Sequence, residues 1–279
     1  MMLAADCHAA ITFVANVDGN WDLFVADDDG SKPVRLTSTP YDEKTPAWSR
    51  DRKSVFYATS DGELNIIDLA SKERRALTPG EGRCPGITPS FSPDGSEVVF
   101  ARFLPGAKDD TDLMILSLKT GKTQRLLEQV GVQLWPAWSP DGRRVVYTSN
   151  HCSSGCGRIV QELWMADAWG GSARQLLMTN SLCQQPAWSS DGKHIAFSSD
   201  RSGSFDLWVL SVEDMKLEQI TSDEALDASP SWSSDGKKLA YVSARSGRME
   251  IRVMDMESRE IKRLRPFGEK EIECKDVSW

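Results

Sequence analysis

Four side chains that could bind a metal ion or form disulfides lie in two neighbouring connections of the predicted structure. The stretch HCSSGC contains His151, Cys152 and Cys156, and Cys183 follows in the next connection. Three thiols and an imidazole are a donor set that zinc accepts. Because the spacing is not a pair of C-x-x-C knuckles, we favour a local or loop-to-loop disulfide. We therefore expect neither a bound metal nor another cofactor.

Catalytic motifs are missing from the sequence. It contains no G-x-S-x-G elbow, no H-E-x-x-H zinc motif, no G-x-G-x-x-G fingerprint and no P-loop. A Ser/His/Asp hydrolase would have to use His151 as its base, and no nucleophile can be identified for it. The sequence therefore favours a non-enzymatic role.

The residues that could contact a ligand are embedded in a repeat. The stretch PAWSPDG, residues 136–142, has near copies in PAWSRDR, PSFSPDG, PAWSSDG and PSWSSDG, and the chain ends on VSW. The aromatic residues of these copies serve as anchors, at intervals of 43, 47, 50, 44 and 47 residues: Trp48, Phe91, Trp138, Trp188, Trp232 and Trp279. Such a period is typical of one propeller blade per repeat.

Each repeat unit predicts four strands. A second aromatic lies nine residues after each of the first five anchors in an alternating apolar pattern, which indicates a strand, and SPDG or SSDG between the two predicts a tight hairpin. A third strand starts with an acidic residue, and a fourth ends on an aliphatic residue. Six such units predict an all-β fold, a six-bladed β-propeller of four-stranded antiparallel blades.

The two ends of the chain are expected to share one blade. The first unit starts at its second strand, in ITFVAN, so the final VSW should pair with it and close the ring, with Trp279 in the core. We expect residues 1–10 to be a leader and residues 11–279 to be a single propeller domain. Cys7 and Cys274 would then lie near each other, where a disulfide requires Cα atoms within about 7 Å.

Two of the four connections in each unit have constant length, and the other two vary. The varying connections share one face of the disc, because strand direction alternates within a blade, and binding residues usually lie on such loops. The candidate binding residues of this face are Asp42, Arg83, Trp135, His151, Asp227 and Glu273. Trp135 stands where the other units have smaller side chains, which suits ligand stacking or an interface anchor. Two structural explanations remain as alternatives to a binding role. Loop length can vary simply because the fold tolerates it, and Trp135 can pack under a long loop.

Composition limits the partners. Lys and Arg total 33 against 41 Asp and Glu, a net charge of -8 without a basic cluster, so nucleic acid is not an expected partner. No apolar run is long enough to span a bilayer. Six cysteines are an even number, which favours an oxidising compartment, although no export signal is seen.

The repeats PAWSPDGRRVVYTS and PAWSSDGKHIAFSSDRSGSFDLWVLS resemble the WD40-like repeats of the TolB-type β-propeller, from Ile11 to Trp279. In that family the propeller follows a small α/β domain and binds a peptidoglycan-associated lipoprotein. Similar repeats form the propellers of prolyl-oligopeptidase-type enzymes. The resemblance implies a stand-alone bacterial propeller, periplasmic or secreted.

Two functions follow from these observations. The first is a monomeric, non-enzymatic scaffold that binds a protein, peptide or glycan with its variable-loop face. The alternative is a small-molecule-binding or metal-dependent enzyme, similar to six-bladed lactonases or lyases, that uses Asp42, Asp227 and Glu273 around the channel mouth. A stoichiometric divalent ion retained after purification would favour the alternative.

Overall fold

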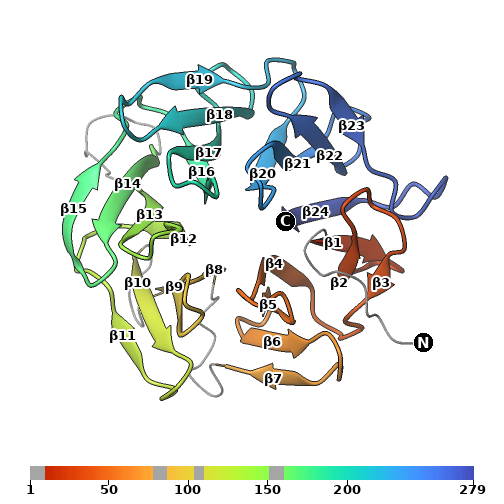
Figure 1. Ribbon diagram of the computed structural model, residues 1–279, viewed down its shortest axis with the longest axis horizontal. Helices are drawn as coiled ribbons and strands as arrows, with labels where there is room; N and C mark the ends of the chain where they lie inside the picture. Colours follow the sequence, from red (N-terminus) through yellow and green to blue (C-terminus); the bar gives the residue numbers. More distant parts are fainter. Residues whose placement is uncertain (1–9, 78–86, 104–109, 151–159) are drawn as a thin grey trace.

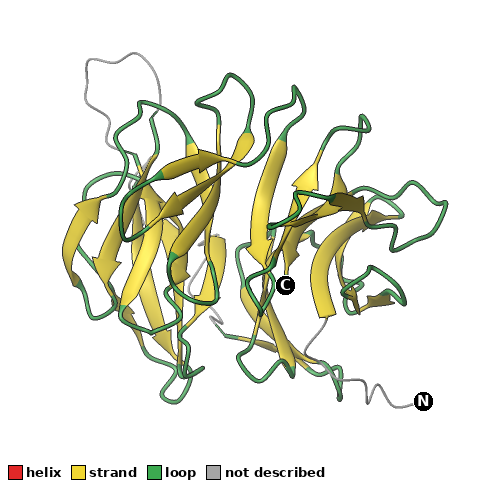
Figure 2. Cartoon of the chain, turned by 45° about the horizontal axis from the view of Figure 1, so that its top comes forward, coloured by secondary structure: helices red, strands yellow, loops and turns green. Residues whose placement is uncertain are grey.

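The described part of the chain, residues 10–77, 87–103, 110–150 and 160–279, folds into β-strands joined by turns and loops. In the computed structural model these strands form six four-stranded antiparallel sheets arranged around a common axis (Figure 1). Loops connect the strands at both ends of the ring (Figure 2). The predicted six-bladed propeller is thus confirmed. In these ranges no helix has the length and apolar character that a bilayer crossing needs.

The blades are numbered along the chain, and their strands are given from the axis outward. Blade 1 contains β24 (Cys274–Ser278), β1 (Ala10–Val17), β2 (Asn20–Asp27) and β3 (Val34–Arg35). Blade 2 contains β4 (Glu43–Trp48), β5 (Ser54–Thr59), β6 (Leu64–Asp68) and β7 (Arg74–Ala76). Blade 3 contains β8 (Ile87–Phe91), β9 (Glu97–Phe103), β10 (Thr111–Ser117) and β11 (Thr123–Arg125).

The second half of the ring repeats this order. Blade 4 contains β12 (Gln133–Trp138), β13 (Arg144–Ser149), β14 (Glu162–Asp167) and β15 (Gly171–Gln175). Blade 5 contains β16 (Cys183–Trp188), β17 (His194–Ser199), β18 (Asp206–Ser211) and β19 (Leu217–Gln219). Blade 6 contains β20 (Asp227–Trp232), β21 (Lys238–Ser243), β22 (Glu250–Asp255) and β23 (Ile261–Arg263).

The first blade is completed by the last strand, as the repeat predicts. β24 pairs antiparallel with β1, with Ala15 opposite Cys274 and Thr12 opposite Ser278. The inner edge of β1 is therefore paired, and blade 1 has four strands like the other blades. Trp279 follows β24 and is only partly buried against the adjoining apolar cluster, so it lies at the margin of the core and not inside it.

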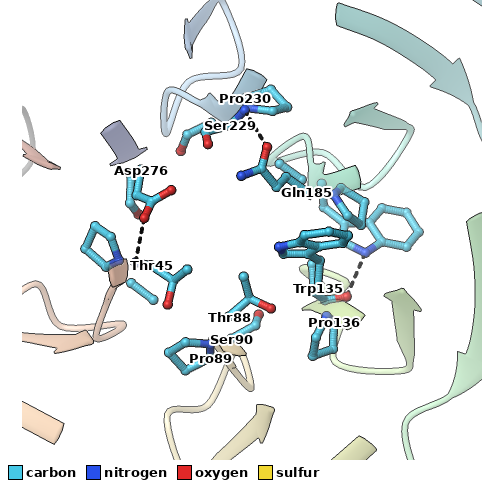
Figure 3. Close-up of a pocket in the computed structure, with 18 of the residues that line it drawn as sticks. Thr45, Thr88, Pro89, Ser90, Trp135, Pro136, Gln185, Ser229, Pro230 and Asp276 are labelled. Atoms are coloured by element: carbon cyan, nitrogen blue, oxygen red, sulfur yellow. Dashed lines mark hydrogen bonds between the residues drawn. The ribbon is translucent and has the colours of Figure 1, made fainter. Parts of the chain in front are cut away.

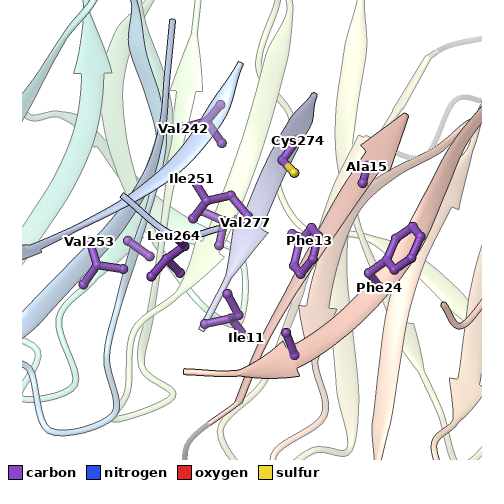
Figure 4. Close-up of a cluster of buried hydrophobic side chains, with 12 residues drawn as sticks. Ile11, Phe13, Ala15, Phe24, Val242, Ile251, Val253, Leu264, Cys274 and Val277 are labelled. Atoms are coloured by element: carbon purple, nitrogen blue, oxygen red, sulfur yellow. The ribbon is translucent and has the colours of Figure 1, made fainter. Parts of the chain in front are cut away.

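The hydrophobic core is divided among the interfaces between blades. At the closing interface, Phe13 and Phe24 of blade 1 belong to one buried cluster with Val242 and Ile251 of blade 6 (Figure 4). The second aromatic of every unit is at most 3% exposed: Phe13, Tyr57, Phe100, Tyr147, Phe197 and Tyr241. The repeated alternation in the sequence thus encodes a repeated interface, since one face of each strand packs on the preceding blade and the other on the next.

The aspartates of the repeated hairpins have a structural role. In blade 4, Ser139 Oγ donates to Asp141 Oδ1 over 2.5 Å, and Gly142 has a φ of +72°. The equivalent bond in blade 3 joins Ser92 to Asp94 over 2.6 Å, and this hydroxyl lowers the pKa of Asp94 to about 2. Each turn aspartate therefore stabilises its hairpin as a carboxylate.

The acidic residue near the start of the third strand also has a structural role in blades 1 and 3. Asp22 forms an ion pair with Arg35, and Asp112 forms one with Arg125 at 2.6 Å. Both carboxylates are at most 3% exposed, in contact with arginines of the fourth-strand side of their own blades. These pairs attach the short outer strands to the blades.

Gly170 provides a test of how closely the blades pack. A Cβ at this position would lie 2.0 Å from the carbonyl oxygen of Leu126 in blade 3, and its φ is +79°. Gly121 occupies the matching turn of blade 3 with a φ of +67° and open space around it. We expect Gly170→Ala to destabilise the fold by at least about 1 kcal/mol more than Gly121→Ala, which carries only the left-handed backbone penalty. Urea unfolding of both variants measures this difference; equal losses would contradict the contact.

Candidate functional site

The innermost strand of each blade carries a β-bulge. In blade 4 the pairing of β12 with β13 shifts register between Leu134 and Ala137, and Trp135 within the shift has a φ of +49°. A left-handed backbone in a non-glycine residue costs about 1–2 kcal/mol, so the surrounding sheet must hold it. The bulge re-aims the side chain relative to the regular strand alternation.

The same left-handed residue recurs in all six blades, with φ between +48° and +54°: Thr45, Thr88, Trp135, Gln185, Ser229 and Asp276. We call these the bulge residues. Five of them precede a proline, and Asp276 precedes Val277. Their side chains are drawn toward the centre of the ring in Figure 3. The repeat therefore places the side chain of one bulge residue from each blade at the axis.

These residues line a pocket of about 300 Å³. Its wall continues from the bulges along the second half of each inner strand and includes Pro140 of the blade 4 hairpin turn. The pocket therefore occupies the half of the axial channel on the side of these hairpin turns, opposite to the face with the variable connections. Proline, alanine and tryptophan provide most of its apolar wall, and serine, threonine and glutamine provide neutral polar groups.

Hydrogen bonds between blades hold four of the six bulge residues. The Thr45 amide donates to Asp276 Oδ2 over 3.1 Å, and the Ser229 amide donates to Gln185 Oε1 over 2.9 Å. A second set of bonds comes from the anchor indoles: Trp188 Nε1 donates to the carbonyl oxygen of the preceding inner strand over 3.1 Å. These bonds join blade 1 to blade 2, blade 4 to blade 5 and blade 5 to blade 6, and they restrain the pocket wall there.

Asp276 is the one ionisable residue among the described residues that line the pocket. Burial raises the pKa of its carboxyl group above the ordinary value, against the lowering effect of the Thr45 amide. The pocket thus combines a single desolvated acidic group with one large aromatic side chain, Trp135.

The three predicted acidic residues differ in their exposure to solvent. Asp42 and Glu273 each directly precede an inner strand, are half-buried, and lie on the side of the variable connections. Asp42 Oδ1 accepts a bond from the amide of Trp21 over 3.2 Å. Asp227 is the first residue of β20 and has no exposed surface, so it cannot contact a partner at the rim. Among the described residues, these three carboxylates do not form a group that could hold a metal ion.

Trp135 is half-buried and faces the axial pocket. The sequence pattern had instead assigned Trp135 to the variable-loop face. Arg83 and His151 lie outside the described residues, as do Cys7, Cys84, Cys152 and Cys156. Cys183 and Cys274 are buried and have free thiols. The possible bridge from Cys7 to Cys274, and those within the HCSSGC stretch, therefore stay predictions.

Five residues of the pocket were not singled out as binding candidates: Thr45, Thr88, Gln185, Ser229 and Asp276. The sequence could have identified them, because each residue occupies the position of Trp135 in its own repeat, three residues before the anchor aromatic. The anchors themselves end the inner strands or directly follow them. In the described ranges, no three His, Cys, Asp or Glu side chains gather as a metal site.

A closed ring of six four-stranded blades with a pocket on its axis defines a six-bladed β-propeller. The family model for the TolB beta propeller domain matches residues 7–181 and 160–277. The chain therefore belongs to the TolB β-propeller family.

Individual relatives match over shorter stretches. The Tol-Pal system protein TolB of Francisella tularensis subsp. mediasiatica is 32% identical over 110 residues, 38% of this chain and 25% of that protein. The uncharacterized peptidase YuxL of Bacillus subtilis is 28% identical over 142 residues, 50% of this chain and 20% of that protein. The matched stretch thus spans a quarter or less of these curated relatives.

Solved structures agree on the fold. The crystal structure of TolB from Acinetobacter baumannii superposes with a TM-score of 0.84 at 24% identity, over 99% of this chain and 67% of that chain. At this identity the likeness establishes the propeller architecture alone.

Proposed function

We propose that this chain is a protein-interaction module that receives a segment of its partner in the axial pocket. The observation that carries the proposal is the ring of six bulge residues. Each blade has one residue with a strained, left-handed backbone, and all six of these residues line the same pocket. Strained backbone positions of this kind cluster at functional sites of proteins, where they position side chains for contact with a ligand or partner. The name of the Francisella relative, a Tol-Pal system protein, supports a partner that is itself a protein.

The pocket suits a narrow segment of polypeptide. Its volume of about 300 Å³ is the size of a few side chains, and its wall alternates apolar surface with hydroxyl and amide groups. Trp135 supplies a large rigid contact surface, as the anchors of protein interfaces do. Contacts from the variable-loop face, including Asp42 and Glu273, would surround the other end of the channel.

Location and assembly belong to the same proposal. We place the chain in the periplasm or outside the cell, which rests on the family relationship and on the even number of cysteines. We further propose that it acts as a monomer, with neither a metal nor another cofactor.

Cross-linked affinity capture from extracts of the source organism tests the role of the pocket. We expect Trp135→Ala to reduce recovery of the partner at least about tenfold, since loss of an interface tryptophan commonly removes about 2 kcal/mol or more. Trp169→Ala is the matched control, because Trp169 is 72% exposed in the turn between β14 and β15 of blade 4 and does not line the pocket. Equal recovery with Trp135→Ala and wild type would contradict the proposal.

A further inference from the structure

Asp276 and Trp135 occupy opposite sides of the axial pocket. Asp276 belongs to blade 1 and Trp135 to blade 4, and in a ring of six blades these two are separated by half a turn. Figure 3 shows both side chains directed into the space between them. Any group bound on the axis at this level lies between a carboxyl group and an indole ring.

No salt bridge neutralises Asp276 within the part of the chain that the structure describes. Lys275, the adjacent residue, has its ammonium nitrogen 4.1 Å from the centre of the Trp21 ring, outside the pocket wall. The charges of Lys275 and Lys44 favour ionisation of Asp276, but burial has the larger effect and raises its pKa. A cation brought into the pocket would therefore relieve an existing electrostatic penalty.

Two hydroxyl groups extend the polar side of the pocket. Thr45 and Thr88 belong to blades 2 and 3 and follow Asp276 around the ring toward Trp135. Their Oγ1 atoms are buried and have no hydrogen-bond partner among the described residues. The Asp276 carboxylate therefore lies on this side of the pocket beside two unsatisfied hydroxyl groups, each of which comes to face the axis when the threonine side chain rotates about its Cα–Cβ bond.

We propose that this pocket binds a primary ammonium group on an alkyl stem, the chemistry of a lysine side chain from the partner. The inference rests on the proposed function and specifies the partner's chemistry. An ammonium group has three donors: one bonds the Asp276 carboxylate, and the other two provide partners for the Thr45 and Thr88 hydroxyls once these have rotated toward the axis. Trp135 attracts the cation through its ring face, and the proline and alanine side chains of the wall contact the stem.

The test uses n-butylammonium as the probe, with n-butanol as its uncharged counterpart and n-butylguanidinium as the planar cation. Ligand-observed NMR titration of the wild-type chain is expected to give a Kd on the order of 1 mM for n-butylammonium and no saturation with n-butanol. Tighter binding of n-butylguanidinium would overturn the proposal in favour of an arginine. Equal binding of n-butanol would show that the site is merely apolar, which also overturns it.

Two substitutions locate the probe. Asp276→Asn keeps an oxygen acceptor for the Thr45 amide but removes the charge, and we expect at least tenfold weaker binding of n-butylammonium. Glu63→Gln removes an exposed carboxylate that does not line the pocket and should leave binding unchanged. If Asp276→Asn does not fold, Thr88→Val, which is isosteric and uncharged, should still weaken binding several-fold. Unchanged binding in the folded pocket variant overturns the proposal.

Partner capture separates this inference from the proposed function. Recovery that depends on Trp135 but not on Asp276 would retain the interaction role and overturn the lysine proposal. Binding of n-butylammonium that requires Asp276, together with recovery independent of Trp135, would retain the ammonium site and overturn the interaction role.

Discussion

Deletion of residues 277–279 is expected to lower the free energy of unfolding by about 3–5 kcal/mol, as for loss of a large core side chain. These residues connect three blades. Val277 is buried in the cluster between blades 6 and 1, the Trp279 amide donates to Ser231 Oγ of blade 6 over 2.9 Å, and the Ser278 carbonyl accepts from Trp48 Nε1 of blade 2 over 3.3 Å. Their removal exposes apolar surface and unpairs polar groups at the closing interface.

Thermal unfolding measures this loss, which corresponds to a decrease in Tm of about 10 °C for a chain of this size. Trp169→Ala is the matched control, since it removes an exposed indole and should change the free energy of unfolding by less than about 0.5 kcal/mol. An unchanged Tm after the deletion would refute closure of the ring through β24.

Replacement of Glu43 by glutamine is expected to reduce the pH dependence of stability. Glu43 begins β4 and is completely buried, and burial, with a further contribution from the Asp22 carboxylate of blade 1, raises its pKa to about 7. Thr39 Oγ1 donates to Glu43 Oε1 over 2.7 Å, which lowers the pKa only in part. The folded protein therefore holds a proton on this group that the unfolded chain releases at a lower pH.

The direction of the effect follows from proton linkage. Between the unfolded value of about 4.5 and the folded value of about 7, the native state binds more protons than the unfolded state, so stability decreases as the pH rises. The contribution of Glu43 is fully present below about pH 4.5 and is lost above about pH 7, a change of up to about 3 kcal/mol. Glu43→Gln does not titrate and lacks this decrease.

Urea unfolding at several pH values between about 4.5 and 8 compares the two proteins. The wild type should lose up to about 3 kcal/mol more than Glu43→Gln across this range, while titrations common to both proteins cancel. Glu63→Gln is the control, because Glu63 is exposed in the same blade. Parallel curves for the wild type and Glu43→Gln would show that Glu43 is ionised throughout.

The architecture could be derived from the sequence because its determinants are local and repeated six times. The alternation of apolar residues specifies which positions are buried, and the Ser-x-Asp-Gly turns specify where each hairpin reverses, as the bond from Ser139 to Asp141 shows. Because the chain starts at the second strand of a unit and ends on a first strand, the two ends are expected to pair, and Thr12 lies opposite Ser278 in the structure. None of these steps requires knowledge of a contact between distant blades.

The candidate site required the tertiary structure, because one residue of register decides where a side chain points. Asp42 and Glu273 stand one residue before their inner strands and keep exposed surface, whereas Asp227 stands at the next position and is completely buried between blades. Strand alternation would not predict the direction of Trp135 or Asp276 either, since the bulge interrupts it.

The sequence by itself therefore determined the number of blades, the strands within them and the closure of the ring. Only the tertiary structure decided that Thr45, Thr88, Trp135, Gln185, Ser229 and Asp276 converge on one pocket. The physical reason is that strands and turns follow from short-range preferences, whereas the pocket is formed by left-handed residues that are held by hydrogen bonds between blades.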